Sequence, residues 1–178
     1  MRITSLVHSL PSLRAAFVVT ALAAGLIAVG VNRSPVEAVD PIVSVDTIAD
    51  GTNTATAVGS IDACRAASQG TTFNVDVVIQ GVASISGVQA HLIYDKLVLK
   101  VTAVNYNFKL GASGASVVDL GDGVPDADGD FEVGAVTLPL SSASGSGVLA
   151  RITLEAIGIG TSVLNLTAVK MTDSAGDP

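Results

Sequence analysis

The residues best suited to chemistry lie in one acidic stretch of the chain. Its aspartates, separated by glycines and other turn-forming residues, are Asp122, Asp126, Asp128 and Asp130. Oxygen ligands at alternate positions of a tight loop suit a hard cation such as Ca²⁺. The last three have the first spacings of an EF-hand loop, but Gly129 comes one place early and Glu132 is too near to be the distant bidentate ligand. The four aspartates are therefore a candidate Ca²⁺ site, with a solvated turn as the alternative, and no cofactor is expected to be required.

Nothing else in the sequence assembles a catalytic group. Apart from His8 near the start, the only histidine is His91, and Cys64 is the only cysteine. No metalloprotease, nucleophile-elbow or glycine-rich phosphate-binding motif is present. Paired carboxylates of the acidic stretch could in principle hydrolyse glycosides, but the aromatic walls that would position a sugar are missing. We therefore predict that the chain is not an enzyme.

A second candidate site follows from strict alternation between residues 88 and 94. Its apolar phase, which we expect to face a core, is Val88, Ala90, Leu92 and Tyr94. The opposite phase, Gln89, His91 and Ile93, then points outward, because successive side chains of a strand alternate between faces. An exposed isoleucine beside histidine and glutamine makes this row a candidate partner-binding sheet face, and an ordinary exposed strand is the alternative.

Two further roles stay open at this stage. Carbohydrate binding normally uses aromatic side chains as stacking surfaces, and with no tryptophan in the chain this role depends on Tyr106 and Phe108 being exposed side by side. A structural surface or adhesion domain without a dedicated ligand fits the composition, which is rich in glycine and has only 3% aromatic residues.

The beginning of the chain has the features of an export signal. Arg2 and Arg14 precede an uncharged apolar run from Ala15 to Val31, and small residues lead up to Ala38. We expect residues 1–38 to be a signal peptide cleaved after Ala38, with an uncleaved membrane anchor as the alternative. The remainder, residues 39–178, would then be secreted or lie at the cell surface. Cys64, being alone, can form no disulfide within the chain.

Short strands must position these sites. Hydrophobic residues make up 49% of the chain, mostly valine, leucine, isoleucine and alanine, which favours a pleated core. We expect strands near residues 41–47, 71–79, 88–94, 97–104, 131–140, 147–156 and 162–169, with residues 81–87 forming a turn. Seven to nine strands without a convincing helix predict an all-β antiparallel sandwich or jelly roll. The net charge of −7 argues against nucleic acid as a partner.

The order of motifs resembles the cohesin domain family. A Val88–Asp95 strand with its Tyr-Asp bend is followed by Leu97-Val-Leu-Lys-Val101, and later by Gly145-Ser-Gly-Val-Leu-Ala-Arg-Ile-Thr-Leu154. The resemblance implies a nine-stranded jelly-roll sandwich over residues 39–178. The sequence ends in a turn-like stretch without a closing strand, and a domain truncated at its C-terminus is one interpretation of this. It also implies a dockerin-type protein partner, or a place in a polysaccharide-handling or cell-surface system. Lys96 departs from the family's usual proline, and Gly87 and Gln89 replace polar residues that contact dockerin in one large subgroup.

Overall fold

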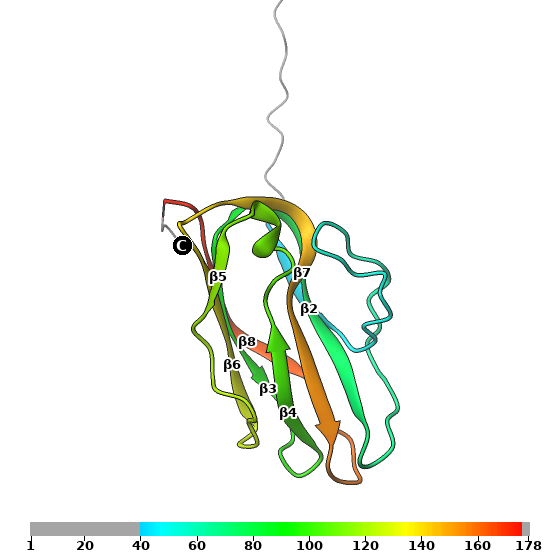
Figure 1. Cartoon of the computed structure of the whole chain (residues 1–178). Coiled ribbons are helices and arrows are strands. Elements are labelled where there is room, and N and C mark those ends of the chain that lie inside the picture. The colour runs from blue at the N-terminus through cyan, green and yellow to red at the C-terminus, as the bar shows by residue number, and fades with distance from the viewer. Residues whose placement is uncertain (1–39, 176–178) are drawn as a thin grey trace, which may run out of the picture. The chain divides into compact units, whose positions relative to one another are not determined.

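A computed structural model describes residues 40–175 as a β-sandwich of two antiparallel sheets (Figure 1). The strands are β1 (Ile42–Asp46), β2 (Thr72–Ile85), β3 (Gly87–Ile93), β4 (Leu99–Asn105), β5 (Ser116–Asp119), β6 (Asp130–Leu138), β7 (Ala143–Ala156) and β8 (Asn165–Thr172), and the one helical turn is η1 (Gly111–Ser113). One sheet has the order β1-β2-β7-β4 and the other β5-β6-β3-β8. The predicted antiparallel sandwich is confirmed, with eight strands within residues 40–175 in place of about nine.

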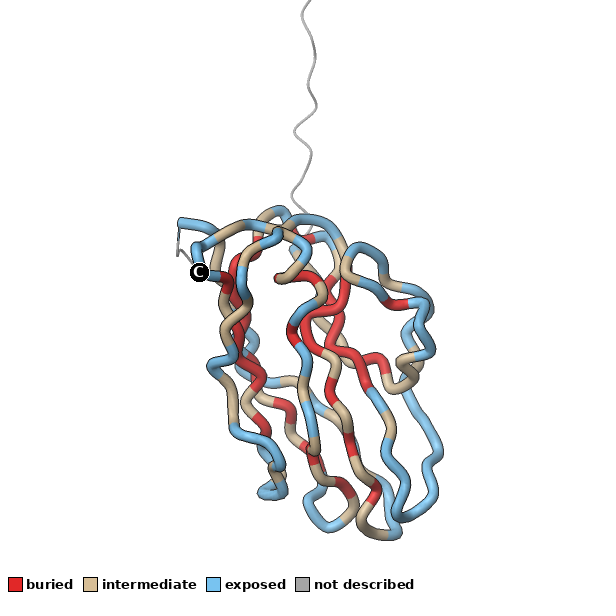
Figure 2. Tube along the Cα trace, in the orientation of Figure 1, coloured by how far each residue is buried: buried red, intermediate tan, exposed pale blue. Residues whose placement is uncertain are grey.

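The core lies between the two sheets, and the most regular alternation of buried and outward residues is on β3 (Figure 2). On β3, Val88, Ala90 and Leu92 are buried, and Tyr94 just beyond it is 5% exposed. These side chains meet fully buried ones such as Phe131 and Leu154 from β6 and β7. The alternation read from the sequence therefore assigns the inner and outer faces of β3 correctly.

The expected turn at residues 81–87 is wrong. β2 continues to Ile85, and the chain passes from one sheet to the other at Ser86. Gly81 has a φ of +77°, and the β2–β7 register shifts twice between Ile79 and Ile85. Glycine with positive φ occurs in β-bulges as well as in turns. The composition of residues 81–87 therefore does not distinguish a turn from a bulged continuation of β2.

The outer face of the β1-β2-β7-β4 sheet is covered by the long connection between β1 and β2. Val78 and Val148 lie opposite each other outside the main core, yet both are 0% exposed. Thr54 of the connection accepts a hydrogen bond of 2.9 Å from the Val148 backbone N–H. A Cβ at Gly147 would lie 2.4 Å from the Ala55 carbonyl oxygen. Glycine at that position therefore lets the connection lie directly on the sheet.

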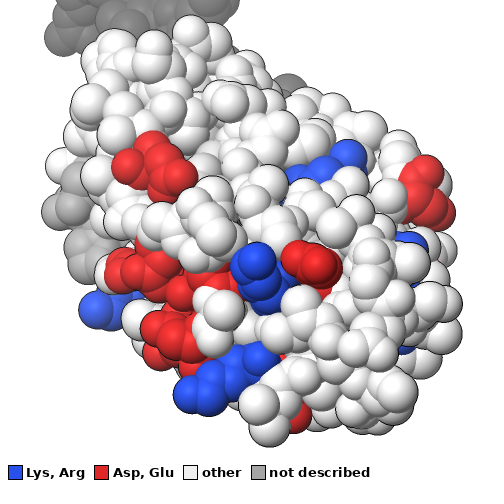
Figure 3. Space-filling model, turned by 60° about the horizontal axis from the view of Figure 1, so that its bottom comes forward, with Lys and Arg blue, Asp and Glu red and all other residues white. Residues whose placement is uncertain are grey.

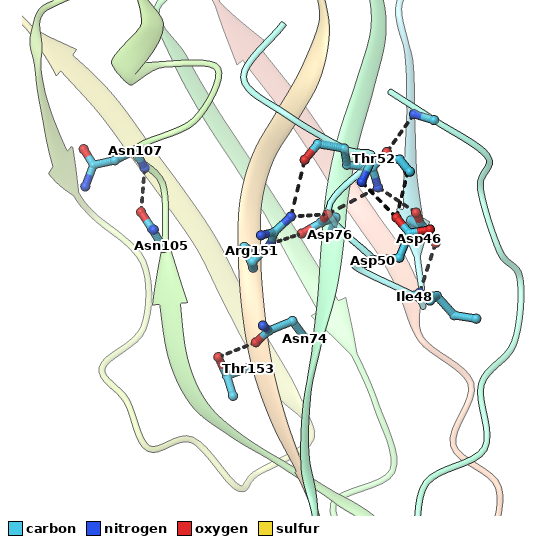
Figure 4. Close-up of polar contacts among 12 residues, drawn as sticks. Asp46, Ile48, Asp50, Thr52, Asn74, Asp76, Asn105, Asn107, Arg151 and Thr153 are labelled. Atoms are coloured by element: carbon cyan, nitrogen blue, oxygen red, sulfur yellow. Dashed lines mark hydrogen bonds and ion pairs between the residues drawn. The ribbon is translucent and has the colours of Figure 1, made fainter. Parts of the chain in front are cut away.

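A buried polar cluster fastens this connection to the sheet (Figure 4). Asp46 and Asp76, paired across β1 and β2, are 1% and 0% exposed. The Asn53 side-chain amide donates to both carboxylates, at 2.6 and 3.3 Å. Arg151 of β7 donates two hydrogen bonds to Asp76, at 2.7 and 2.9 Å. These bonds raise the pKa of Arg151 above the ordinary arginine value. The cluster thus joins one arginine, one asparagine and two aspartates from three strands and the connection.

Some expectations fall on residues outside the described range. The predicted export signal, its apolar run and its cleavage after Ala38 all lie in residues 1–39, of which nothing is described. Within residues 40–175, no helix is long and apolar enough to cross a membrane. Cys64 is a free, exposed thiol in the β1–β2 connection.

Candidate functional site

The predicted outward row lies on the open face of the β5-β6-β3-β8 sheet. Gln89 is exposed, and His91 and Ile93 are half-buried. In the register of the sheet they stand opposite Gly134, Glu132 and Asp130 of β6. β3 is flanked by β6 on one side and β8 on the other, so this row occupies the middle of the sheet's outer surface.

Two polar pairs fix side chains on this surface. The Gln89 side-chain amide donates to Glu132 Oε1 at 2.7 Å, and His91 Nδ1 lies 2.8 Å from Asp130 Oδ1. The hydrogen bond to Asp130, with the nearby charges of Glu132 and Asp122, raises the pKa of His91 above 6.5. The row therefore presents side chains in set orientations, beside carboxylates that favour a protonated imidazole.

A groove of about 510 Å³ opens beside this row. It is lined in part by Gly87 and Gly134, which have no side chains, and by Leu120, Glu132 and Lys170. Leu120 is 62% exposed, which is unusual for a large apolar side chain. A Cβ at Gly134 would lie only 3.0 Å from the Gly121 backbone nitrogen, so glycine there lets the segment after β5 approach β6. The groove combines an apolar wall with a carboxylate and an ammonium group at its rim.

The acidic stretch does not gather its carboxylates into one site. Each of the four predicted ligands has its own contact within the protein. Asp122 accepts from the Glu132 N–H at 2.7 Å, Asp126 from the Tyr94 hydroxyl at 2.5 Å, Asp128 from the Asp130 N–H at 2.9 Å, and Asp130 contacts His91. Among residues 40–175, no group of three or more histidines, cysteines, aspartates or glutamates is placed to hold a metal ion. The Ca²⁺ site stays a prediction.

Negative charge nevertheless gathers at this end of the sandwich. Figure 3 shows several acidic side chains on one side of the lower end, with Lys and Arg side chains directly beside them. The stretch from Asp119 to Glu132 contributes six carboxylates. Since Asp130 and Glu132 contact the outward row of β3 directly, this charge borders the candidate site.

The aromatic surface that direct sugar binding would need is not formed. Tyr106 is 4% exposed, and its hydroxyl accepts a hydrogen bond from the Gly134 N–H at 3.3 Å. Phe108 is half-buried, and the Arg151 guanidinium carbon lies 4.8 Å from the centroid of its ring. Neither ring is available as an exposed neighbour of the other, so this mode of carbohydrate binding loses its main support.

Comparison with known families decides the identity of the domain. The cohesin domain profile matches residues 57–178, more than half of the chain. The chain belongs to the cohesin family. Cohesin domains are non-catalytic protein–protein interaction modules, so the prediction that the chain is not an enzyme is confirmed. The match begins within the β1–β2 connection, so β1 itself lies outside it.

Solved cohesin structures share the fold at low sequence identity. A cohesin of a type I cohesin–dockerin complex from Clostridium thermocellum is 15% identical with a TM-score of 0.55, covering 77% of this chain and 89% of that one. The sixth cohesin of scaffoldin B from Acetivibrio cellulolyticus, in complex with a dockerin, is 15% identical with a TM-score of 0.52, covering 78% and 89%. A Clostridium acetobutylicum cohesin is 17% identical with a TM-score of 0.52, covering 77% and 81%. A search of curated protein sequences gave no match.

Sequence reasoning found the row on β3 but missed its surroundings. Glu132, Leu120 and Lys170 come from β6, the segment after β5, and β8, and they meet the row only through strand pairing. The sequence offered one signal for the groove. Leu120 is an apolar residue between Asp119 and Asp122, in a stretch that is otherwise polar and rich in glycine.

Proposed function

We propose that this chain is a dockerin-binding cohesin module, which holds its partner on the outer face of the β5-β6-β3-β8 sheet. The observation that carries the proposal is the open surface around Gln89, His91 and Ile93, with a groove beside it. Dockerins are the partners in the solved complexes of similar structures.

The outer face of the β1-β2-β7-β4 sheet is already occupied around Val78 and Val148. The β1–β2 connection lies on it, buries Val78 and Val148, and is fastened by Asp76 and Arg151. A partner that binds to the outer face of a sheet can therefore use the β5-β6-β3-β8 sheet without displacing the β1–β2 connection. Protein partners commonly bind through a few well-packed apolar anchors surrounded by polar contacts, and the groove beside Leu120 with Glu132 at its rim has this character.

The proposed setting is outside the cytoplasm, on the cell surface or in a secreted assembly that handles polysaccharide. This part of the proposal is supported by the export-type sequence of residues 1–38 and by the acidic composition.

The experiment is an affinity capture from the secreted fraction of the source organism, with bound proteins identified by mass spectrometry. The baits are the chain, the double variant Gln89→Lys with His91→Glu, and the control Thr72→Lys, whose exposed site lies on the other sheet. Each is run with Ca²⁺ and with chelator.

We expect a dockerin-bearing protein on the chain and on the control, and its loss on the double variant. Equal capture by all three baits would refute the assigned face. Absence of any dockerin-bearing protein from every bait would refute dockerin binding itself.

A further inference from the structure

The most exposed apolar side chains of the domain lie in two neighbouring loops. Within residues 40–175, the three most exposed large apolar side chains are Ile159 at 92%, Leu97 at 77% and Val163 at 75%, and the next of this kind is 62% exposed. Leu97 lies in the β3–β4 turn, residues 94–98, and the other two lie in the β7–β8 loop, residues 157–164. Both segments are at the lower end of the sandwich in Figure 1. We call them together the apolar tip.

Hydrogen bonds join the two segments of the apolar tip. The Asp95 N–H donates to Ser162 Oγ at 2.8 Å. The Gly158 N–H donates to the Val98 carbonyl oxygen at 3.2 Å. A Cβ at Gly158 would lie 2.0 Å from the Leu97 carbonyl oxygen, so glycine at this position lets the turn and the loop touch. The exposed side chains therefore project from one connected platform.

The fold does not need these side chains for its core. Apolar side chains stabilise a domain in proportion to the area that they remove from water, and side chains that are 75% or more exposed remove little. Single exposed apolar residues are common on protein surfaces. Three of them on joined loops instead indicate a contact surface.

The charged residues of the apolar tip are one acid and one base. Asp95 and Lys96 directly precede Leu97, and both are exposed. Neither forms an ion pair within residues 40–175. In a two-fold contact, residue i of one copy meets residue j of the other, and j meets i. A surface with one charge of each sign beside an apolar group is therefore complementary to a second copy of itself.

A lipid surface fits the apolar tip less well. The Tyr94 N–H donates to the Gly129 carbonyl oxygen at 3.0 Å, which brings Asp128 and Asp130, on either side of that glycine, next to the tip. Anionic lipids attract clusters of basic residues, and the tip offers Lys96 alone. Charge complementarity thus favours a second copy of the chain over a membrane.

We infer that the apolar tip binds the apolar tip of a second copy of this chain, forming a two-fold symmetric, end-to-end dimer. Leu97, Ile159 and Val163 pack against the same side chains of the other copy, and Lys96 of each copy lies against Asp95 of the other. Three apolar side chains per copy make a small interface of the weak, transient class, so the dimer forms at high protein concentration. The inference is independent of dockerin binding, because its test measures the chain alone.

Sedimentation equilibrium of the full chain measures the association. The mass should rise from 17.7 kDa toward twice that value as the protein concentration approaches about 1 mM. Leu97→Gln combined with Ile159→Gln should keep the mass of one copy, with an unchanged circular dichroism spectrum. Leu140→Gln is the matched control, because residue 140 is 44% exposed in the β6–β7 connection at the other end of the sandwich. It should dimerise like the unaltered chain.

An exchange of charges locates the contact. Lys96→Glu alone and Asp95→Lys alone each place like charges against each other across the two-fold axis, so each should raise the concentration needed for dimerisation. Equal amounts of the two variants mixed together should form a heterodimer, because an acidic tip then faces a basic one.

Three results would overturn the inference. The first is the mass of one copy at every concentration. The second is a dimer that persists in Leu97→Gln combined with Ile159→Gln. The third is a mixture of the two charge variants that associates no better than either variant alone.

Discussion

Removal of the Arg151 side-chain charge tests the buried cluster that holds the β1–β2 connection. In Arg151→Met, the Asp76 carboxylate loses two hydrogen bonds of 2.7 and 2.9 Å. Asp76 is 0% exposed, and its neighbour Asp46 is 1% exposed. The variant leaves two buried carboxylates that share the side-chain amide of Asn53, without a counter-charge.

The expected loss of stability can be worked out from this geometry. Breaking a buried ion pair by removing one partner costs about 3–5 kcal/mol. The Arg151 side chain is 23% exposed, so solvent already weakens its attraction to Asp76 and places the cost near the lower end, at about 3 kcal/mol. For a domain of this size, that corresponds to a melting temperature lower by about 10 °C.

Thermal and urea unfolding followed by circular dichroism measure the loss. Arg151→Lys is the matched variant, since it keeps the charge but not the two-pronged geometry, and should fall between the chain and Arg151→Met. The double variant Asp76→Leu with Arg151→Met should be more stable than Arg151→Met alone, because no unpaired carboxylate remains at residue 76. A loss under about 1 kcal/mol for Arg151→Met would refute the reasoning, as would a double variant no more stable than the single one.

Three further outcomes are expected. The pKa of His91 is raised in the folded chain, so its contact with Asp130 stabilises the fold below pH 6.5, and this stabilisation is lost as the pH rises through the raised pKa. In an NMR titration, Asp130→Asn should lower the pKa of His91. Burial lowers the pKa of Lys109, so stability should increase as pH rises through that lowered value toward 10.5, and Lys109→Met should flatten the increase in urea unfolding. A Ca²⁺ site at Asp122, Asp126, Asp128 and Asp130 predicts that chelator lowers the melting temperature by several degrees, and an unchanged melting temperature would refute that site.

The parts of the fold that were predictable are those where burial follows a period of two. β3 is the clearest case, since it has a core on one side and an open surface on the other. Prediction failed where the chain bends without ending a strand. The stretch from Gly81 to Ser86 contains glycine and serine as a turn would, but pairing with β7 continues to Ile85. The energetic preference for continued pairing depends on β7, about 60 residues away in sequence, and no local pattern encodes it.

The candidate site was predictable in one strand and not across strands. Gln89, His91 and Ile93 follow from alternation within β3 alone. The contacts of Gln89 with Glu132 and of His91 with Asp130 depend on how β6 is aligned against β3. That register is set by burial of both strands in the sandwich core, so the polar partners become identifiable only when the pairing is known.

The acidic stretch shows that residue spacing alone does not place carboxylates side by side. Alternate aspartates place carboxylates on the same side only if the backbone holds them there. Here Asp126 belongs to a bridge with Val101 and accepts from the Tyr94 hydroxyl, whereas Asp130 begins β6 and contacts His91 on the outer face. Strand pairing thus separates neighbouring carboxylates, and each gives a different part of the domain its hydrogen-bond acceptor. Asp130 orients His91 on the proposed binding face, whereas Asp126 and Asp122 accept hydrogen bonds from Tyr94 and from the Glu132 backbone, and the Ca²⁺ site stays a prediction.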